Sequence, residues 1–142
     1  MNIEEVREYA LSLNEQVTED LFVKSWISWR IAGKWFLLTN LDVPEPHVAV
    51  KMLPDVAIDL RERYEGVGPA IHMNKKNWSE LYLNQLDDDF VKEQIKASFD
   101  LVVSKLPKNA LSQLVLARDG FEKFAVSPKD ITSLAKKFEN SI

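Results

Sequence analysis

The sequence predicts an α+β fold, a two-layer sandwich whose antiparallel sheet carries its helices on one face. Three observations lead to this prediction. Residues 3–13 and 87–105 place apolar side chains at helical spacing, which indicates amphipathic helices packed on a core. Residues 21–53 hold runs of aromatic and β-branched residues separated by Gly and Pro, which favours strands. The chain has 142 residues, 46% of them hydrophobic, which suits one such domain.

The N-terminal segment predicts a helix over residues 3–13. One face of this helix consists of Ile3, Val6, Ala10 and Leu13. Glu4 and Glu5 fall in the first turn, where carboxylates interact favourably with the positive end of the helix dipole. The helix is therefore expected to begin near residue 3 and to pack its apolar face against the sheet.

The next segment predicts a three-stranded antiparallel meander over residues 21–53. Strands are expected at residues 26–31, 34–41 and 47–53. Ala32-Gly33 predicts a tight turn, because glycine can adopt a positive φ. The second connection, Asp42–Pro46, holds two prolines, which cannot donate ladder hydrogen bonds.

After the meander, the sequence predicts a helix, a strand and a long helix. Pro54 opens the first helix and Gly66 is expected to cap its end. Its inward side chains are expected to be Val56, Leu60 and Tyr64. A strand follows at residues 78–83, and the aspartates 87–89 mark the start of a helix that reaches about Lys105. The buried stripe of that helix is expected to be Val91, Ile95, Phe99, Val102 and Leu106.

Residues 109–142 predict a helical extension packed on the α+β domain of residues 1–108. Ala110–Arg118 has helical character, and Ser127–Asp130 predicts the start of a last helix, with Ser as N-cap and Pro at the first position. One face of that helix consists of Ile131, Leu134, Ala135 and Phe138. Such a stripe on a terminal helix usually docks on its own domain.

Composition narrows the functional classes. The absence of cysteine excludes disulfides, thiol catalysis and thiolate metal sites, and it fits a cytoplasmic protein. No apolar run approaches the roughly 18 residues of a membrane span, and the N-terminus lacks the features of a signal peptide. The net charge of −4 counts mildly against nucleic-acid binding, although a local basic patch can act within an acidic chain.

No motif indicates catalysis, so an enzyme is not expected. Gly66-Val-Gly68 follows a predicted helix and lacks the third glycine of a dinucleotide fingerprint. His47 and His72 have no partner at metal-ligand spacing, and neither a metal nor another cofactor is expected. The acids of the first 20 residues invite comparison with an acidic metal-binding ridge, but scattered carboxylates are usually a solvated helix face.

Several short sequence motifs in the predicted elements resemble those of a known family. They are Gly33–Phe36, Val48–Lys51, Leu60–Tyr64 with Gly66 and Pro69, His72–Trp78, and Asp100–Pro107. In this order and spacing, over residues 1–108, the chain resembles the MmcQ/YjbR family. The resemblance implies a CyaY-like α+β fold, similar to the bacterial frataxin homologue, in a small bacterial cytosolic protein. It also implies DNA binding through a double-wing arrangement of hairpins.

The leading hypothesis is therefore a non-catalytic DNA-binding protein. Lysines and arginines near the hairpins would contact phosphates, Trp78 or Trp35 could stack on a base, and asparagines could reach base edges. The candidate residues are Arg30, Lys34, Lys51, His72, Asn74, Lys75, Lys76 and Trp78. If they do not bind nucleic acid, Lys75 and Lys76 are expected to belong to a solvated loop, and Trp78 is expected to pack in the core.

The alternative hypothesis is a protein-interaction module, present as a monomer or a homodimer. Because side chains alternate along a strand, Trp26 and Trp29 cannot both point into the core. One of them is expected to be partly exposed on the sheet face, where aromatic residues favour docking of a protein partner. The C-terminal extension could also cover this face.

Overall fold

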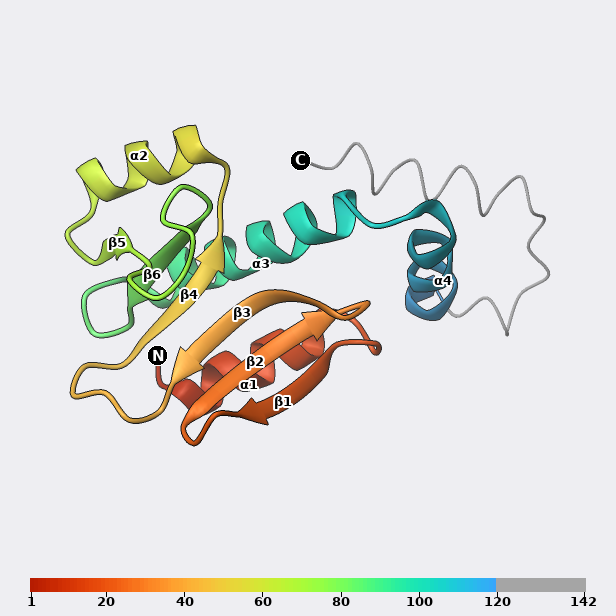
Figure 1. Ribbon diagram of the computed structural model, residues 1–142, viewed down its shortest axis with the longest axis horizontal. Helices are drawn as coiled ribbons and strands as arrows, with labels where there is room; N and C mark the ends of the chain where they lie inside the picture. Colours follow the sequence, from red (N-terminus) through yellow and green to blue (C-terminus); the bar gives the residue numbers. More distant parts are fainter. Residues whose placement is uncertain (120–142) are drawn as a thin grey trace.

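The computed structural model describes residues 1–119, which contain four helices and six strands (Figure 1). In chain order the elements are α1 (Ile3–Ser12), β1 (Thr18–Phe22), β2 (Trp26–Ile31), β3 (Lys34–Asn40), β4 (His47–Lys51), α2 (Pro54–Arg63), β5 (Val67–Pro69), β6 (Trp78–Tyr82), α3 (Asp88–Ser104) and α4 (Lys108–Asp119). The predicted last helix from Ser127 lies outside the described residues.

The strands form one open antiparallel sheet in the order β1-β2-β3-β4-β6-β5. Figure 1 shows α1 and α3 behind this sheet. The predicted two-layer α+β class is thereby confirmed. The face turned away from α1 and α3 is called the open face below.

All four helices contribute to one core on the helix side of the sheet. From the strands it receives Trp29, Ile31, Phe36, Leu37, Val48, Val50 and Leu81. From the helices it receives Val6, Ala10, Ala57, Leu60, Val91, Ile95, Phe99, Val102, Val103, Leu111 and Leu114. Burial of this apolar surface, at about 25 cal/mol per Å², is the main stabilising contribution to the fold.

A smaller cluster lies on the open face. Its centre is Leu38, Ala49 and Ala70, and around these pack Phe22, Trp26, Met73 and Trp78. The loop of residues 70–77 contributes Ala70 and Met73 and so covers part of this face. As alternation predicts, Trp29 is fully buried on the helix side while Trp26 is only half-buried on the open face.

Two strands were absent from the sequence prediction. The edge strand β1, Thr18–Phe22, is mostly exposed and carries two acids, so neither alternation nor burial marks it. The strand β5, Val67–Pro69, has three residues, too few to show a period.

The prediction for α2 is partly wrong. Its buried residues are Ala57 and Leu60, whereas Val56 is 42% exposed. The helix ends at Arg63, and Tyr64 is already extended, so Gly66 is not its cap. Gly66 instead packs closely: a Cβ there would lie 2.8 Å from Cγ of Leu86.

The first part of the predicted extension belongs to the main core. Helix α4 begins at Lys108, and its Leu111 and Leu114 are buried among the core residues. Among residues 1–119, no helix combines the length and the apolar composition that crossing a bilayer requires. The same residues hold no group of three or more His, Asp or Glu side chains that could bind a metal ion.

Candidate functional site

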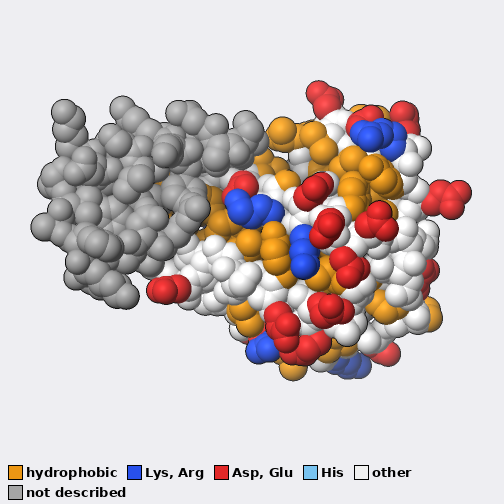
Figure 2. All heavy atoms as spheres, turned by 180° about the vertical axis from the view of Figure 1, so that it is seen from behind, with side chains coloured by type: hydrophobic (Ala, Val, Ile, Leu, Met, Phe, Trp, Pro, Cys, Tyr) orange, Lys and Arg blue, Asp and Glu red, His pale blue; other side chains and the backbone are white. Residues whose placement is uncertain are grey.

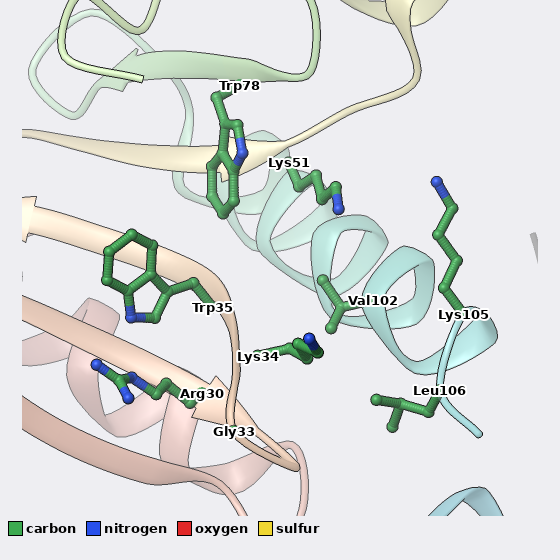
Figure 3. Close-up of a pocket in the computed structure, with 9 residues that line it drawn as sticks. All are labelled: Arg30, Gly33, Lys34, Trp35, Lys51, Trp78, Val102, Lys105 and Leu106. Carbon is green, nitrogen blue, oxygen red and sulfur yellow. The ribbon is translucent and has the colours of Figure 1, made fainter. Parts of the chain in front are cut away.

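A cleft opens where strands β3 and β4 separate. Their ladder contains three residue pairs and ends at Leu37 and Val50, so the start of β3 and the end of β4 diverge. Val102 near the end of α3 and Leu106 just after that helix contribute to the lining of this opening (Figure 3). The resulting cleft has a volume of about 620 Å³, within the range of small-ligand sites.

A serine of α3 bridges the two strands at this point. The Ser98 hydroxyl donates to the Phe36 carbonyl at 2.6 Å and accepts from the Lys51 N–H at 2.8 Å. By the register of the ladder, Phe36 and Lys51 would be the next pair. Because the strands have separated, the Phe36 carbonyl and the Lys51 N–H cannot bond to each other. The fully buried Ser98 hydroxyl provides a hydrogen-bond partner for both.

A β-bulge determines which way Trp35 points. On β2, Trp29 pairs with Leu37 and Arg30 pairs with Trp35, so Phe36 is the extra residue of β3. Phe36 packs against Phe99 of α3, with ring centroids 5.3 Å apart. Without the bulge, alternation would direct Trp35 to the helix side; with it, Trp35 lies on the open face beside Arg30.

Four residues form a row across the open face, called the cation–indole row below. They are Arg30 on β2, Trp35 on β3, Lys51 on β4 and Trp78 on β6. Arg30 is paired with Trp35 and Lys51 with Trp78 in the sheet register. Figure 3 shows Trp78 directed toward Trp35 across the cleft. The row therefore alternates cations and aromatic rings on neighbouring strands.

Two further lysines stand at the end of the cleft. Lys34 follows the β2–β3 turn, and Lys105 follows the last residue of α3. Among residues 1–119, the nine that line the cleft include four cations and no carboxylate. Asp20, on β1, approaches from outside the cleft, with its Oδ2 3.6 Å from Nη2 of Arg30.

Electrostatics at Lys51 reflect this arrangement. Burial lowers the pKa of its ammonium, and repulsion from Lys105 and Lys34 lowers the pKa further. The charged lysine is therefore less favourable here than in water. A bound anion would relieve the repulsion, so the cleft is suited to phosphate or carboxylate groups.

Acidic residues gather elsewhere. Figure 2, seen from behind Figure 1, shows many Asp and Glu side chains on the helix side. Exposed acids of this side include Glu4, Glu5 and Glu8 of α1 and Glu93 of α3. The net charge of −4 thus coexists with a cationic cleft that opens between β3 and β4.

The structure divides the candidate residues predicted from sequence into two sets. Arg30, Lys34, Lys51 and Trp78 line the cleft. His72, Asn74, Lys75 and Lys76 lie on the loop of residues 70–77, and all four are exposed.

Local hydrogen bonds fix that loop. The Asn74 side chain accepts from the Lys76 N–H at 3.0 Å, which is a turn role. Nη2 of Arg61 donates to the carbonyls of Lys75 and Trp78, at 2.6 and 2.9 Å. Arg61 therefore holds the loop close to the start of β6 and helps to position Trp78.

A second, more apolar hollow adjoins the cleft on the open face. It has a volume of about 450 Å³ and shares Trp35 with the cleft. The lining residues are Phe22, Val23, Trp26, Trp35, Leu38, Asn40, His72 and Met73. The His72 ring meets Trp26 edge-on, with centroids 5.9 Å apart, so His72 faces this hollow and not the cationic cleft.

Comparison with known proteins places the chain in a family. The YjbR family model matches residues 11–101, which is more than half of the chain. The chain belongs to the YjbR family. The resemblance to MmcQ/YjbR proteins that the sequence phrases predict is therefore confirmed.

Relatives in Escherichia coli share this family. Protein YjbR of strain K12 is 29% identical over 118 residues, which cover 81% of this chain and 98% of the relative. Protein YbdF of strain O157:H7 is 30% identical over 81 residues, which cover 56% of this chain and 66% of the relative. Neither name states an activity or a ligand.

Two solved structures share the fold of this YjbR-family protein. A crystal structure of the Deinococcus radiodurans protein DR2400 superposes with a TM-score of 0.73 at 20% identity, covering 80% of this chain and 87% of that one. A protein from Pseudomonas syringae gives a TM-score of 0.63 at 26% identity, covering 71% and 98%. The family match ends at residue 101, so Val102, Lys105 and Leu106 of the cleft follow it directly.

The predicted candidates lack several residues of the site, among them Trp35, Lys105 and Ser98. Trp35 is expected from sequence only as a possible stacking residue, and the bulge places its ring on the open face. Lys105 is far from Lys51 along the chain, and only packing of α3 brings the two together. Ser98 carried one signal: it is a hydroxyl next to the predicted buried stripe of α3.

Proposed function

We propose that this YjbR-family protein binds nucleic acid through the cationic cleft and performs no chemical step on it. The observation that carries the proposal is the cleft itself. Four cations and two indoles surround one opening, and no carboxylate lines it among residues 1–119. Cations provide phosphate contacts, and indoles provide surfaces for bases.

The physical basis of such binding is release of counterions from the phosphates. Each Lys or Arg that neutralises a phosphate lowers the slope of log K against log salt by about 0.9 on a duplex, or about 0.7 on a single strand. Four cations therefore support a steep salt dependence. The acids on the helix side repel the same polymer, so they orient it toward the open face.

The experiment is a salt titration of binding to fluorescently labelled DNA, followed by anisotropy. The test variant combines Lys34→Glu with Lys105→Glu, two exposed lysines of the cleft. We expect affinity to fall at least about tenfold, and the salt slope to become shallower by about one to two.

The matched control combines Lys92→Glu with Lys96→Glu. Both lysines are exposed on α3 and lie outside the cleft lining, and the change in net charge is the same. Equal losses in the two variants would show that overall charge, and not the cleft, governs binding. Wild-type protein without affinity at low salt would refute the proposal altogether.

The double variant Lys75→Glu, Lys76→Glu tests whether the loop of residues 70–77 contacts phosphates, as the sequence analysis predicts. These lysines are exposed but do not line the cleft. We expect a weaker effect than that of the cleft variant, because the loop lysines can contact only phosphates beyond the cleft. A larger effect would move the main phosphate contacts to the loop.

A second candidate function, self-association through the apolar hollow, is favoured by one observation. Val23 at its rim is 74% exposed and has a φ of 41°, an unfavourable conformation for a β-branched residue. Light scattering tests this candidate against the Val23→Asp variant. A dimer that the substitution converts to a monomer supports it, and a monomeric wild type at every concentration refutes it.

A further inference from the structure

We infer that the nucleic acid bound by the cation–indole row is single-stranded. Two successive unpaired nucleotides lie across the strands, with one base on Trp35, one on Trp78, and their linking phosphate at Lys51. This inference rests on the proposed function and specifies the form of its ligand. It follows from the spacing of the row, the exposure of its rings and the lining of the cleft.

The spacing of the row follows from the sheet. Regular spacing of about 4.8 Å between neighbours would put β3 and β6, with β4 between them, about 10 Å apart, and the separation of β3 from β4 beyond Leu37 and Val50 widens this gap. Lys51 is paired with Trp78 and stands one residue beyond Val50, the last partner of β3. Lys51 therefore lies on the strand between the two indoles at nearly the same level, and its side chain extends toward α3 at the side of the row (Figure 3). This order, ring, cation, ring, matches base, phosphate, base.

The ring of Trp35 is fixed but accessible. Phe22 stacks on it with centroids 5.6 Å apart and planes at 20°, and the Arg30 guanidinium carbon lies 5.5 Å from its centroid. The residue nevertheless keeps 37% of its surface exposed. A ring held in place before binding loses little entropy when a base stacks on it.

Trp78 is held by its surroundings in a similar way. It packs at the edge of the smaller cluster and is half-buried, and Arg61 binds its backbone carbonyl at 2.9 Å. Its indole points into the cleft toward Trp35 (Figure 3). Both aromatic surfaces are therefore presented to one ligand from opposite sides.

A duplex would leave most of these features unused. Its bases are stacked within the helix, and its outer surface offers phosphates and groove edges. The indoles and the apolar side chains of Val102 and Leu106 would then meet charged backbone. Aromatic rings interleaved with cations in a groove are the usual means of binding single strands, because every base offers a flat ring for stacking.

The test compares three labelled probes at one salt concentration. They are a single strand of about 12 nucleotides, its duplex, and the same strand with abasic sites throughout its centre. The abasic strand keeps every phosphate but has no bases to stack. We expect the intact strand to bind about tenfold or more tightly than either of the others, and to quench tryptophan fluorescence.

Substitution of the indoles then identifies the stacking residues. Trp35→Leu and Trp78→Leu should each remove most of the preference for the intact strand over the abasic strand, while the salt slope stays unchanged. Trp35→Phe and Trp78→Phe should restore much of that preference, since phenylalanine also stacks. Circular dichroism and thermal unfolding of each variant show whether it remains folded.

The possible results distinguish failure of the proposed function from failure of the single-strand inference. No binding of any probe refutes the proposed function and this inference together. Equal binding of all three probes supports phosphate recognition but refutes the single-strand inference. A free mononucleotide that competes as strongly as the strand also refutes it, because the ligand would then be a small molecule. Equal affinity for an RNA strand and for the DNA strand supports the single-strand inference, because the proposed contacts involve only bases and phosphates.

Discussion

At the scale of single residues, one extra residue in β3 decides the character of the open face. The bulge at Phe36 sends that ring into the core and turns Trp35 outward beside Arg30. Bulges commonly redirect side chains next to functional sites. The sequence Lys-Trp-Phe-Leu-Leu of this strand contains no mark of the bulge, because all of its apolar residues fit either face.

Ser98 is the residue whose loss should affect the cleft most directly. In Ser98→Ala, the Phe36 carbonyl and the Lys51 N–H lose their common partner inside the protein. We expect the free energy of unfolding to fall by about 1–3 kcal/mol, measured by denaturant titration.

Ser104→Ala is the matched control in the same helix. The Ser104 hydroxyl donates to the Leu101 carbonyl one turn earlier and bridges no strands. Its removal should change the free energy of unfolding by less than about 0.5 kcal/mol. Equal effects of the two substitutions would show that the bridge between strands adds no stability.

The lowered pKa of Lys51 predicts a pH dependence of binding. Burial, and then repulsion from Lys105 and Lys34, disfavours the protonated amine in the folded protein. Phosphate binds the protonated form, so affinity should decrease as pH rises through this lowered pKa. The decrease in wild type should begin at a lower pH than the titration of an ordinary lysine would give, and Lys51→Met should lack its Lys51 component.

The same shift has a consequence for stability. Because the folded-state pKa of Lys51 lies below its unfolded value, the unfolded chain binds more protons between the two values. The unfavourable contribution of Lys51 is fully present below the folded pKa and is lost as the pH rises toward the unfolded pKa. Lys51→Met should therefore leave the melting temperature at neutral pH unchanged or raised, and a clear decrease would contradict this account.

At the scale of elements, the β2–β3 hairpin positions Lys34 and Trp35 through a two-residue turn. Ala32 and Gly33 have φ values of 50° and 78°, as the favoured hairpin turns with two positive φ angles require. The sequence prediction of a tight turn with positive φ at Gly33 is confirmed. The turn also sets the register in which Ile31 pairs with Lys34.

Gly33→Ala tests this turn without a steric clash. A Cβ at Gly33 would meet no heavy atom within 4 Å, so any cost arises from the backbone conformation alone. We expect a loss of about 1–2 kcal/mol by thermal or chemical unfolding, and a smaller loss for Gly33→Asn. If the Gly33→Ala variant unfolds at the same denaturant concentration as the wild type, the positive φ assigned to Gly33 is contradicted.

At the scale of the whole molecule, helix α4 joins the domain to the segment that follows it. Leu111 is fully buried in the main core, although it lies beyond residue 108, where the predicted domain boundary falls. We expect Leu111→Ala to lower the free energy of unfolding by about 2–5 kcal/mol. Asn109→Ala, on an exposed position of α4, should change it by less than about 0.5 kcal/mol. Equal losses of stability in Leu111→Ala and Asn109→Ala would show that α4 does not contribute to the core.

Charge is also organised over the whole molecule. The acids of α1 lie on the helix side of the sheet, whereas Arg30 and Lys51 of the cleft lie on the open face. A net charge of −4 therefore understates the attraction of one face for anions. Composition alone weighed against nucleic-acid binding, because a sum over residues carries no direction in space.

The sequence by itself determined the elements whose periodicity is strong. Helices α1 and α3, strands β2, β3 and β4, and the turn at Gly33 follow from spacing, β-branched and aromatic residues, and glycine. Sequence motifs also predicted the YjbR family. Among the binding residues predicted from sequence, those that line the cleft are Arg30, Lys34, Lys51 and Trp78. These features are local, so a single stretch of chain carries the information for each.

Only the tertiary structure decided how those residues form a site. The bulge that turns Trp35, the separation of β3 from β4 around Ser98, and the approach of Lys105 from α3 each require contacts between distant segments. Such contacts depend on packing of α3 against the sheet, and no periodicity within either segment encodes them. The physical reason is that a strand's pattern shows which side chains are apolar, whereas packing determines where a strand bends and what fills the opening.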